Sequence, residues 1–168
     1  NNDVLNLTDD GIEMDYSERN TRCFENRATN AFQGISTQPV YGGPVYIFRN
    51  VVYNIEVEPF KIHSDPSGAL IFHNTMVKNG VPMLVLTPAA MSNFVIKNNL
   101  FIGSPGPYAC QMDLGKITNT DMDYNGYGDG PWESFLRWQR KAYTLDEVRK
   151  GGPAERNAGV VNGKEAFA

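Results

Sequence analysis

The densest group of side chains able to do chemistry lies near the N-terminus. Four carboxylates occur within the seven residues Asp9-Asp10-Gly11-Ile12-Glu13-Met14-Asp15. Such a group could bind Ca²⁺, which takes about 6–8 oxygen ligands, or supply the acid and base of a glycosidase. In the alternative interpretation Asp9 and Asp10 form a turn, while Glu13 and Asp15 lie on a solvated strand face. Because acidic residues are poor strand formers, we favour a functional role and predict all four as metal ligands.

A second candidate is the pair Lys61 and His63, two residues apart in the short run Phe60-Lys61-Ile62-His63. A lyase that acts on a uronate needs a neutral lysine or histidine base, and a cation to neutralise the sugar carboxylate. Cationic or desolvating neighbours would lower the pKa of Lys61 enough for this task. The alternative is that both residues lie on an ordinary exposed sheet, as we expect for His73.

The elements that must position these residues follow from an internal repeat. Asparagines at 26, 50, 74 and 98 are each 24 residues apart, and a degenerate fifth unit ends at Asn125. Each unit holds three short β-like runs and has no room for a helix, which predicts a coil of parallel strands. Each coil rises by about 4.8 Å, so equivalent residues stack above one another.

Strand alternation predicts which side chains face the interior. In the run before each asparagine we expect inward side chains at Phe24, Phe48, Phe72 and Ile96. The residues expected to face outward form an apolar stripe at Cys23, Ile47, Ile71 and Val95. Four apolar residues of the C-terminal segment could cover this stripe: Trp132, Phe135, Leu136 and Trp138.

The third run of each repeat carries the candidate chemistry. We take Ile12, Ile35, Phe60, Leu84 and Cys110 as equivalent core positions. The next outward row is then Glu13, Ser36, Lys61, Val85 and Gln111, and the row two residues further on is Asp15, Gln38, His63, Thr87 and Asp113. A slip of one position would turn a row inward.

Roles follow from these rows. The predicted catalytic residues are Lys61, His63, Glu13 and Asp15. The predicted substrate-binding residues are Gln38, Tyr41, Gln111 and Asp113. Tyr41 lies in the loop Gln38-Pro39-Val40-Tyr41-Gly42-Gly43-Pro44, where it could stack on a sugar ring, or simply belong to a tight turn between strands.

The phrase Ile96-Lys97-Asn98-Asn99-Leu100-Phe101 resembles the right-handed parallel β-helix of the pectate-lyase-like superfamily. The resemblance covers roughly residues 9 to 127. It implies an inward asparagine ladder at the turn between the second and third strands, and a polysaccharide groove over the strand that carries Lys61 and His63. The superfamily includes lyases, hydrolases, epimerases, esterases and phage tailspikes, so the resemblance implies the fold more strongly than the reaction.

Composition narrows the classes of partner and of protein that remain. A net charge of −4 disfavours nucleic acid as the main partner, and no apolar run is long enough to span a membrane. Two cysteines are too few for a disulfide scaffold. The start Asn1-Asn2-Asp3 lacks an initiator Met, which leads us to expect further N-terminal coils from the same or another chain.

We therefore expect an all-β, right-handed parallel β-helix of about five coils. Residues 1–130 would form the helix, and residues 131–168 an irregular or short-helical cap, with Thr144 beginning a helix. The expected function is that of a secreted or periplasmic lyase on an acidic polysaccharide, with Ca²⁺ as a candidate cofactor. The alternatives are an inverting glycoside hydrolase that uses the carboxylates, and a non-catalytic glycan-binding solenoid such as part of an adhesin or tailspike.

Overall fold

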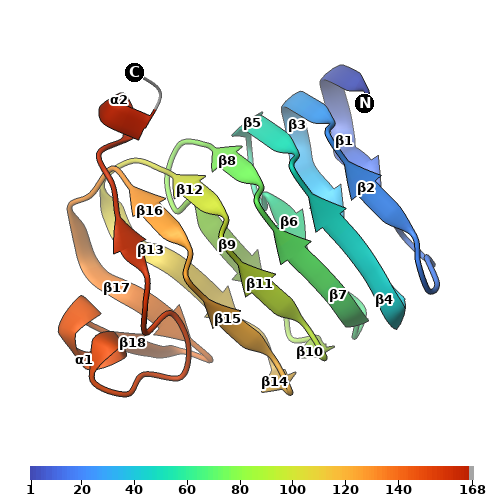
Figure 1. The fold of residues 1–168 in the computed structure, drawn as a ribbon. Coiled ribbons are helices and arrows are strands. Elements are labelled where there is room, and N and C mark those ends of the chain that lie inside the picture. Colours follow the sequence, from blue (N-terminus) through green and yellow to red (C-terminus); the bar gives the residue numbers. More distant parts are fainter. Residues whose placement is uncertain (167–168) are drawn as a thin grey trace.

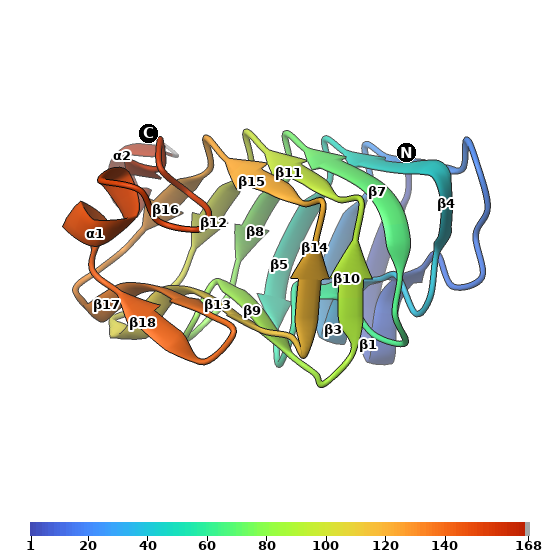
Figure 2. The same ribbon diagram turned by 90° about the horizontal axis from the view of Figure 1, so that it is seen from below.

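The chain forms an all-β parallel solenoid of about five coils with a repeat of about 25 residues. The computed structural model describes residues 1–166. Strands of successive coils lie side by side along one axis, from the N-terminal coil at one end to the two short helices at the other (Figures 1 and 2). Every strand pair within the coils is parallel; the last hairpin, β17–β18, is antiparallel. The predicted fold class is confirmed.

Three sheets make up the walls of the solenoid. Sheet A contains β1 (Asp3–Glu13), β3 (Arg27–Ser36), β5 (Val51–Ile55), β6 (Phe60–Lys61), β8 (Thr75–Val77), β12 (Leu100–Ile102), β16 (Gly126–Gly128) and β19 (Gly159–Val160). Sheet B contains β2 (Arg22–Phe24), β4 (Tyr41–Phe48), β7 (Ser67–Phe72), β10 (Ala90–Ser92), β11 (Val95–Lys97), β14 (Lys116–Thr118) and β15 (Asp121–Asp123). Sheet C contains β9 (Met83–Leu86), β13 (Gly106–Asp113), β17 (Trp132–Trp138) and β18 (Lys141–Tyr143).

A ladder of buried asparagines joins the coils at the turn between sheets B and A. The backbone N–H of each asparagine donates to the side-chain oxygen of the next, over 3.0 Å from Asn26 to Asn50 and again from Asn50 to Asn74. The ladder continues through Asn99 and Asn125. Each amide therefore satisfies polar groups that would otherwise be buried without a partner.

The prediction of Asn98 as a ladder member is wrong, because the fourth coil is one residue longer. Asn98 is exposed and has a φ of +55°, close to the values of Glu25, Arg49 and His73 in the preceding coils. It occupies the left-handed position that precedes each ladder asparagine. Two adjacent asparagines made the two positions indistinguishable by residue type.

The same left-handed residue reverses the predicted faces in the first three coils. Strict alternation would put Phe24 and Asn26 on one side, but the positive φ of Glu25 between them breaks the alternation. Cys23, Ile47 and Ile71 are buried, in register with Ile96. Of the four side chains predicted to face inward in this run, Ile96 is the one that is fully buried. The outer surface instead carries stacked rings: Phe24 on Phe48 and Phe48 on Phe72, with centroids 5.1 and 5.2 Å apart.

The C-terminal segment closes the last coil. β17, within the segment predicted as the cap, pairs with β13 and extends sheet C, so its apolar residues do not cover the predicted stripe. The helix α1 (Leu145–Arg149) follows Thr144, whose side chain accepts from the Glu147 N–H in a capping box, as predicted. α2 (Gly163–Ala166) ends the described part. No helix among residues 1–166 is long and apolar enough to cross a membrane, and both cysteines are free and buried.

Candidate active site on the third strand row

The candidate site lies on the outer surface of the third strand of each coil, which we call the floor. The floor comprises residues 10–15, 33–38, 58–63, 84–86, 108–113 and 134–138. In the first three coils the register of the row nearest the core matches the prediction, because Glu13 pairs with Ser36 and Ser36 with Lys61. Ser36 was expected to face outward but is fully buried. These strands stay in register because Ile35 and Phe60, next to the row, are fully buried.

The predicted row slips by one residue in the fourth coil. Val85 is fully buried, and Leu84 pairs with Gln111. The outward residues of β9 are therefore Leu84 and Leu86, not Val85 and Thr87. Loop length differs between the third and fourth coils, and the apolar run Met83–Leu86 offers no polar residue that would distinguish the faces.

Lys61 forms an ion pair across two coils with Asp10, with Nζ 2.8 Å from Oδ2. The Asp10 side chain is only 1% exposed, and its Oδ1 has no partner among the described residues. Burial by itself would lower the pKa of Lys61, but the hydrogen bond and charge of Asp10, with the charges of Asp15 and Asp9, raise it above its ordinary value. The expected lowering of this pKa is therefore not found, and Lys61 is a protonated cation.

His63 contacts a buried carboxylate that the sequence did not suggest. Its Nε2 lies 2.9 Å from Oε2 of Glu58, whose side chain is 2% exposed, against 27% for that of His63. The other Glu58 oxygen accepts the backbone N–H of Leu86 at 2.6 Å. Burial raises the pKa of Glu58, although the Leu86 N–H, His63 and Lys61 each oppose the shift.

Two further features surround this pair. Lys78 is buried, and desolvation lowers its pKa, opposed by the charges of Glu56 and Glu58. Glu58 belongs to a polar row at the corner before the third strand: Asp10 pairs with Gln33, and the Gln33 side chain accepts the Glu58 N–H at 3.0 Å. Polar residues at these three positions, 23 and 25 residues apart, were the signal that could have revealed Glu58.

The acidic end of the floor is held by local hydrogen bonds. Asp15 accepts from the Ser36 hydroxyl and from the Gln38 N–H, the latter at 2.8 Å. The side-chain oxygen of Gln38 is buried and has no partner among the described residues. Glu13 is exposed. Among residues 1–166 no group of three His, Cys, Asp or Glu side chains that could hold a metal ion is found, and Ca²⁺ binding by Asp9, Asp10, Glu13 and Asp15 stays a prediction.

The other predicted binding residues make contacts of their own. Tyr41 is 60% exposed and its ring lies 6.3 Å from that of Tyr16. Gln111 donates to Asp113, which also accepts from Arg137 Nε at 2.7 Å. Arg137 stands over the ring of Tyr108. The structure thus brings Lys61 and His63 together with Asp10 and Glu58, while Gln111 and Asp113 form a separate cluster beyond Leu84 and Leu86.

This arrangement suits proton transfer at His63. A carboxylate that accepts from Nε2–H fixes the neutral tautomer in which Nδ1 is the basic nitrogen. The neighbouring ammonium group of Lys61 supplies positive charge at the surface. The chain matches no protein-family model, no curated protein and no solved structure.

Proposed function

We propose that the chain is a polysaccharide lyase that cleaves a uronate-containing polymer by β-elimination on the floor. The observation that carries the proposal is the contact of His63 with buried Glu58, 2.9 Å away, beside the cation Lys61. This is a base with an orienting group and an adjacent positive charge on one solvent-accessible surface. The resemblance to the pectate-lyase-like superfamily supports the same reaction class.

In the proposed reaction Nδ1 of His63 removes the proton next to the uronate carboxylate. The electron pair forms a carbon–carbon double bond, the glycosidic bond breaks, and the leaving oxygen takes up a proton from solvent. His63 then releases its proton to solvent, so that no water is consumed. Lys61 donates one of its three N–H groups to Asp10. Its remaining N–H groups stabilise the sugar carboxylate as negative charge develops. Glu58 holds the imidazole in the basic tautomer.

Hydrolysis is the second candidate, favoured by a different property of Glu58. Burial raises the pKa of this carboxyl, which suits a general acid, and Asp15 or Glu13 would serve as the base of an inverting glycosidase. A non-catalytic glycan-binding solenoid is the third. A polysaccharide substrate fits a secreted or periplasmic protein in all three cases.

The products distinguish these candidates. We expect polygalacturonate or alginate to yield unsaturated ends, seen as new ultraviolet absorbance together with reducing ends. Reducing ends without absorbance would show hydrolysis, and retention of polymer without either would show binding alone; each result would refute the lyase. Parallel reactions with Ca²⁺ and with a chelator test whether substrate-bound calcium contributes.

A further inference from the structure

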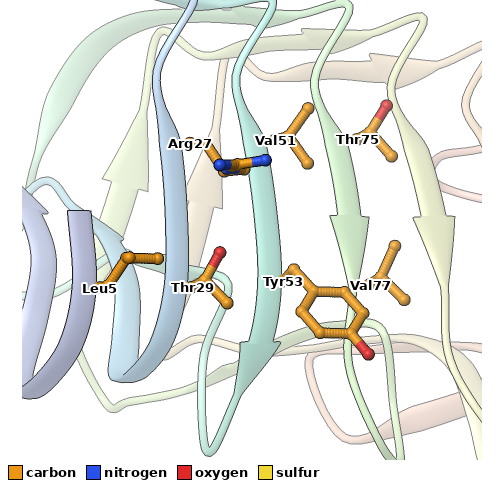
Figure 3. A pocket seen from close by; sticks show the side chains of 7 residues that line it. All are labelled: Leu5, Arg27, Thr29, Val51, Tyr53, Thr75 and Val77. Carbon is orange, nitrogen blue, oxygen red and sulfur yellow. The ribbon is translucent and has the colours of Figure 1, made fainter. Parts of the chain in front are cut away.

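The outer face of sheet A carries a second, chemically different surface. A groove of about 600 Å³ opens over β1, β3, β5 and β8 (Figure 3). Three of its apolar side chains are widely exposed: Leu5 by 53%, Val51 by 42% and Tyr53 by 51%. A contiguous exposed apolar surface of this kind is typical of a binding site. Its lining residues differ from those of the floor: on β1 and β3 the groove takes Leu5, Arg27 and Thr29, whereas the floor takes the later residues 10–13 and 33–36.

Strand register builds the groove from two rows. Leu5, Thr29, Tyr53 and Val77 form one row across four coils, and Arg27, Val51 and Thr75 form the other. Figure 3 shows the Tyr53 ring beside Val77, with the Thr29 hydroxyl in the same row. An aromatic ring and methyl groups therefore alternate with hydroxyls at the strand spacing of about 4.8 Å.

A row of exposed amides borders the groove. Asn30 donates to Asn6 at 2.9 Å, and Asn54 donates to Asn30 at 2.7 Å. Each directly follows a groove residue in sequence and has a positive φ. Unlike the buried ladder, these amides lie in solvent, where they can donate to and accept from a bound molecule.

The groove is electrically balanced. Arg27 is the single charged residue among its seven lining residues, and its guanidinium is paired with Asp3. A neutral ligand therefore complements this surface, whereas a polyanion fits the floor with its cationic Lys61. A flat apolar partner protein would leave the threonine hydroxyls and asparagine amides buried without partners.

We propose that this groove binds a neutral polysaccharide, with a pyranose ring stacked on Tyr53. The apolar face of the sugar covers Tyr53 and Val77, and its hydroxyls bond to Thr29 and to the amide border. Because the rows run across the coils, the glycan lies along the solenoid axis. The site is independent of the reaction proposed for the floor.

The test is affinity electrophoresis of the whole chain in gels that contain xyloglucan, galactan or mannan, with polygalacturonate as the charged comparison. We expect retardation by at least one neutral polymer. Tyr53→Ala should weaken that binding about tenfold, because the stacking surface is removed, while Tyr53→Phe should keep it. Tyr124→Ala is the matched control, since Tyr124 is also exposed, by 55%, but lies outside the groove.

Two results would overturn the proposal. One is no retardation by any of the three neutral polymers. The other is equal retardation of wild type and Tyr53→Ala. Sedimentation of the same variants adds a third: if Tyr53→Ala turns a dimer into a monomer and leaves glycan binding unchanged, the groove is an interface between copies. Binding that persists in His63→Ala would show that the groove acts independently of the floor.

Discussion

The buried asparagine ladder and the floor are both rows that cross every coil, yet their sequences behave in opposite ways. The ladder repeats one residue through Asn26, Asn50, Asn74, Asn99 and Asn125. The floor row at the same repeat changes at each coil, through Glu13, Ser36, Lys61, Leu84, Gln111 and Arg137. Uniform buried polar groups are what stacking requires. The variation on the floor is not required by the fold, and it is where we propose the chemistry.

Breaking the ladder should have the largest effect on stability. Asn74 is 1% exposed; its oxygen accepts from the N–H and the amide of Asn50, and its own amide donates to Ile47 and Asn99. Asn74→Ala leaves several buried donors and acceptors without a hydrogen-bond partner, and each such group costs about 1–3 kcal/mol. We expect the free energy of unfolding to fall by about 3–5 kcal/mol, measured by urea denaturation.

The exposed amide border provides the matched control. The side-chain amide of Asn54 makes a similar hydrogen bond, to Asn30, but it lies in solvent and the residue has a φ of +55°. Asn54→Gly removes the amide and tolerates this φ, so its cost should stay below about 1 kcal/mol. Equal losses for the two variants would mean that burial is not what makes the ladder important.

At the C-terminal end of the ladder, the titration of Glu155 should have a smaller effect on the free energy of unfolding, and one that depends on pH. Glu155 is fully buried and accepts from the Asn125 amide and the Tyr127 hydroxyl, both at 2.7 Å, while its Oε2 has no partner among the described residues. Burial raises the pKa of Glu155 to about 7. The folded state therefore binds this proton more tightly than the unfolded state does.

Stability should consequently fall as the pH rises from about 4.5 through about 7. The loss attributable to Glu155 is about 3 kcal/mol. Glu155→Gln should remove this decline, so the variant should be more stable than wild type at pH 8 and differ little at pH 5. The pKa of Asp123 is lowered despite its desolvation, because Asn157 and Tyr124 donate to it. The titration of Asp123 therefore changes stability below the pH range in which Glu155 titrates. Parallel pH curves for the two proteins would refute the assignment.

Much of the fold could be predicted because the ladder imposes a repeat. The repeat gave the number of coils, the parallel strands and the register of Glu13, Ser36 and Lys61, and the sequence around Thr144 gave the capped helix. The errors arose where one residue changes the geometry. Asn98 and Asn99 are interchangeable by type, and the left-handed residue before each ladder position reversed the faces of Cys23 and Ile47.

The candidate site was only partly predictable, since ion pairing depends on distance across coils. Lys61 and Asp10 are 51 residues apart in sequence, so their contact, and with it the raised pKa of Lys61, could not be seen. Glu58 was missed because it sits at the corner before the third strand, outside the alternation used to assign faces. His63 was predicted, but the group that orients it was not.

The central claim is that His63 on the floor acts as the base. The chain has two histidines, and His73 lies on the outer surface at the ladder turn, so His73→Ala is a matched control. The decisive measurement is kcat/KM for formation of unsaturated ends from the uronate polymer that is cleaved. We expect His63→Ala to lower it by about 10²–10⁴-fold and His73→Ala to leave it unchanged. Wild-type activity in His63→Ala would contradict the account.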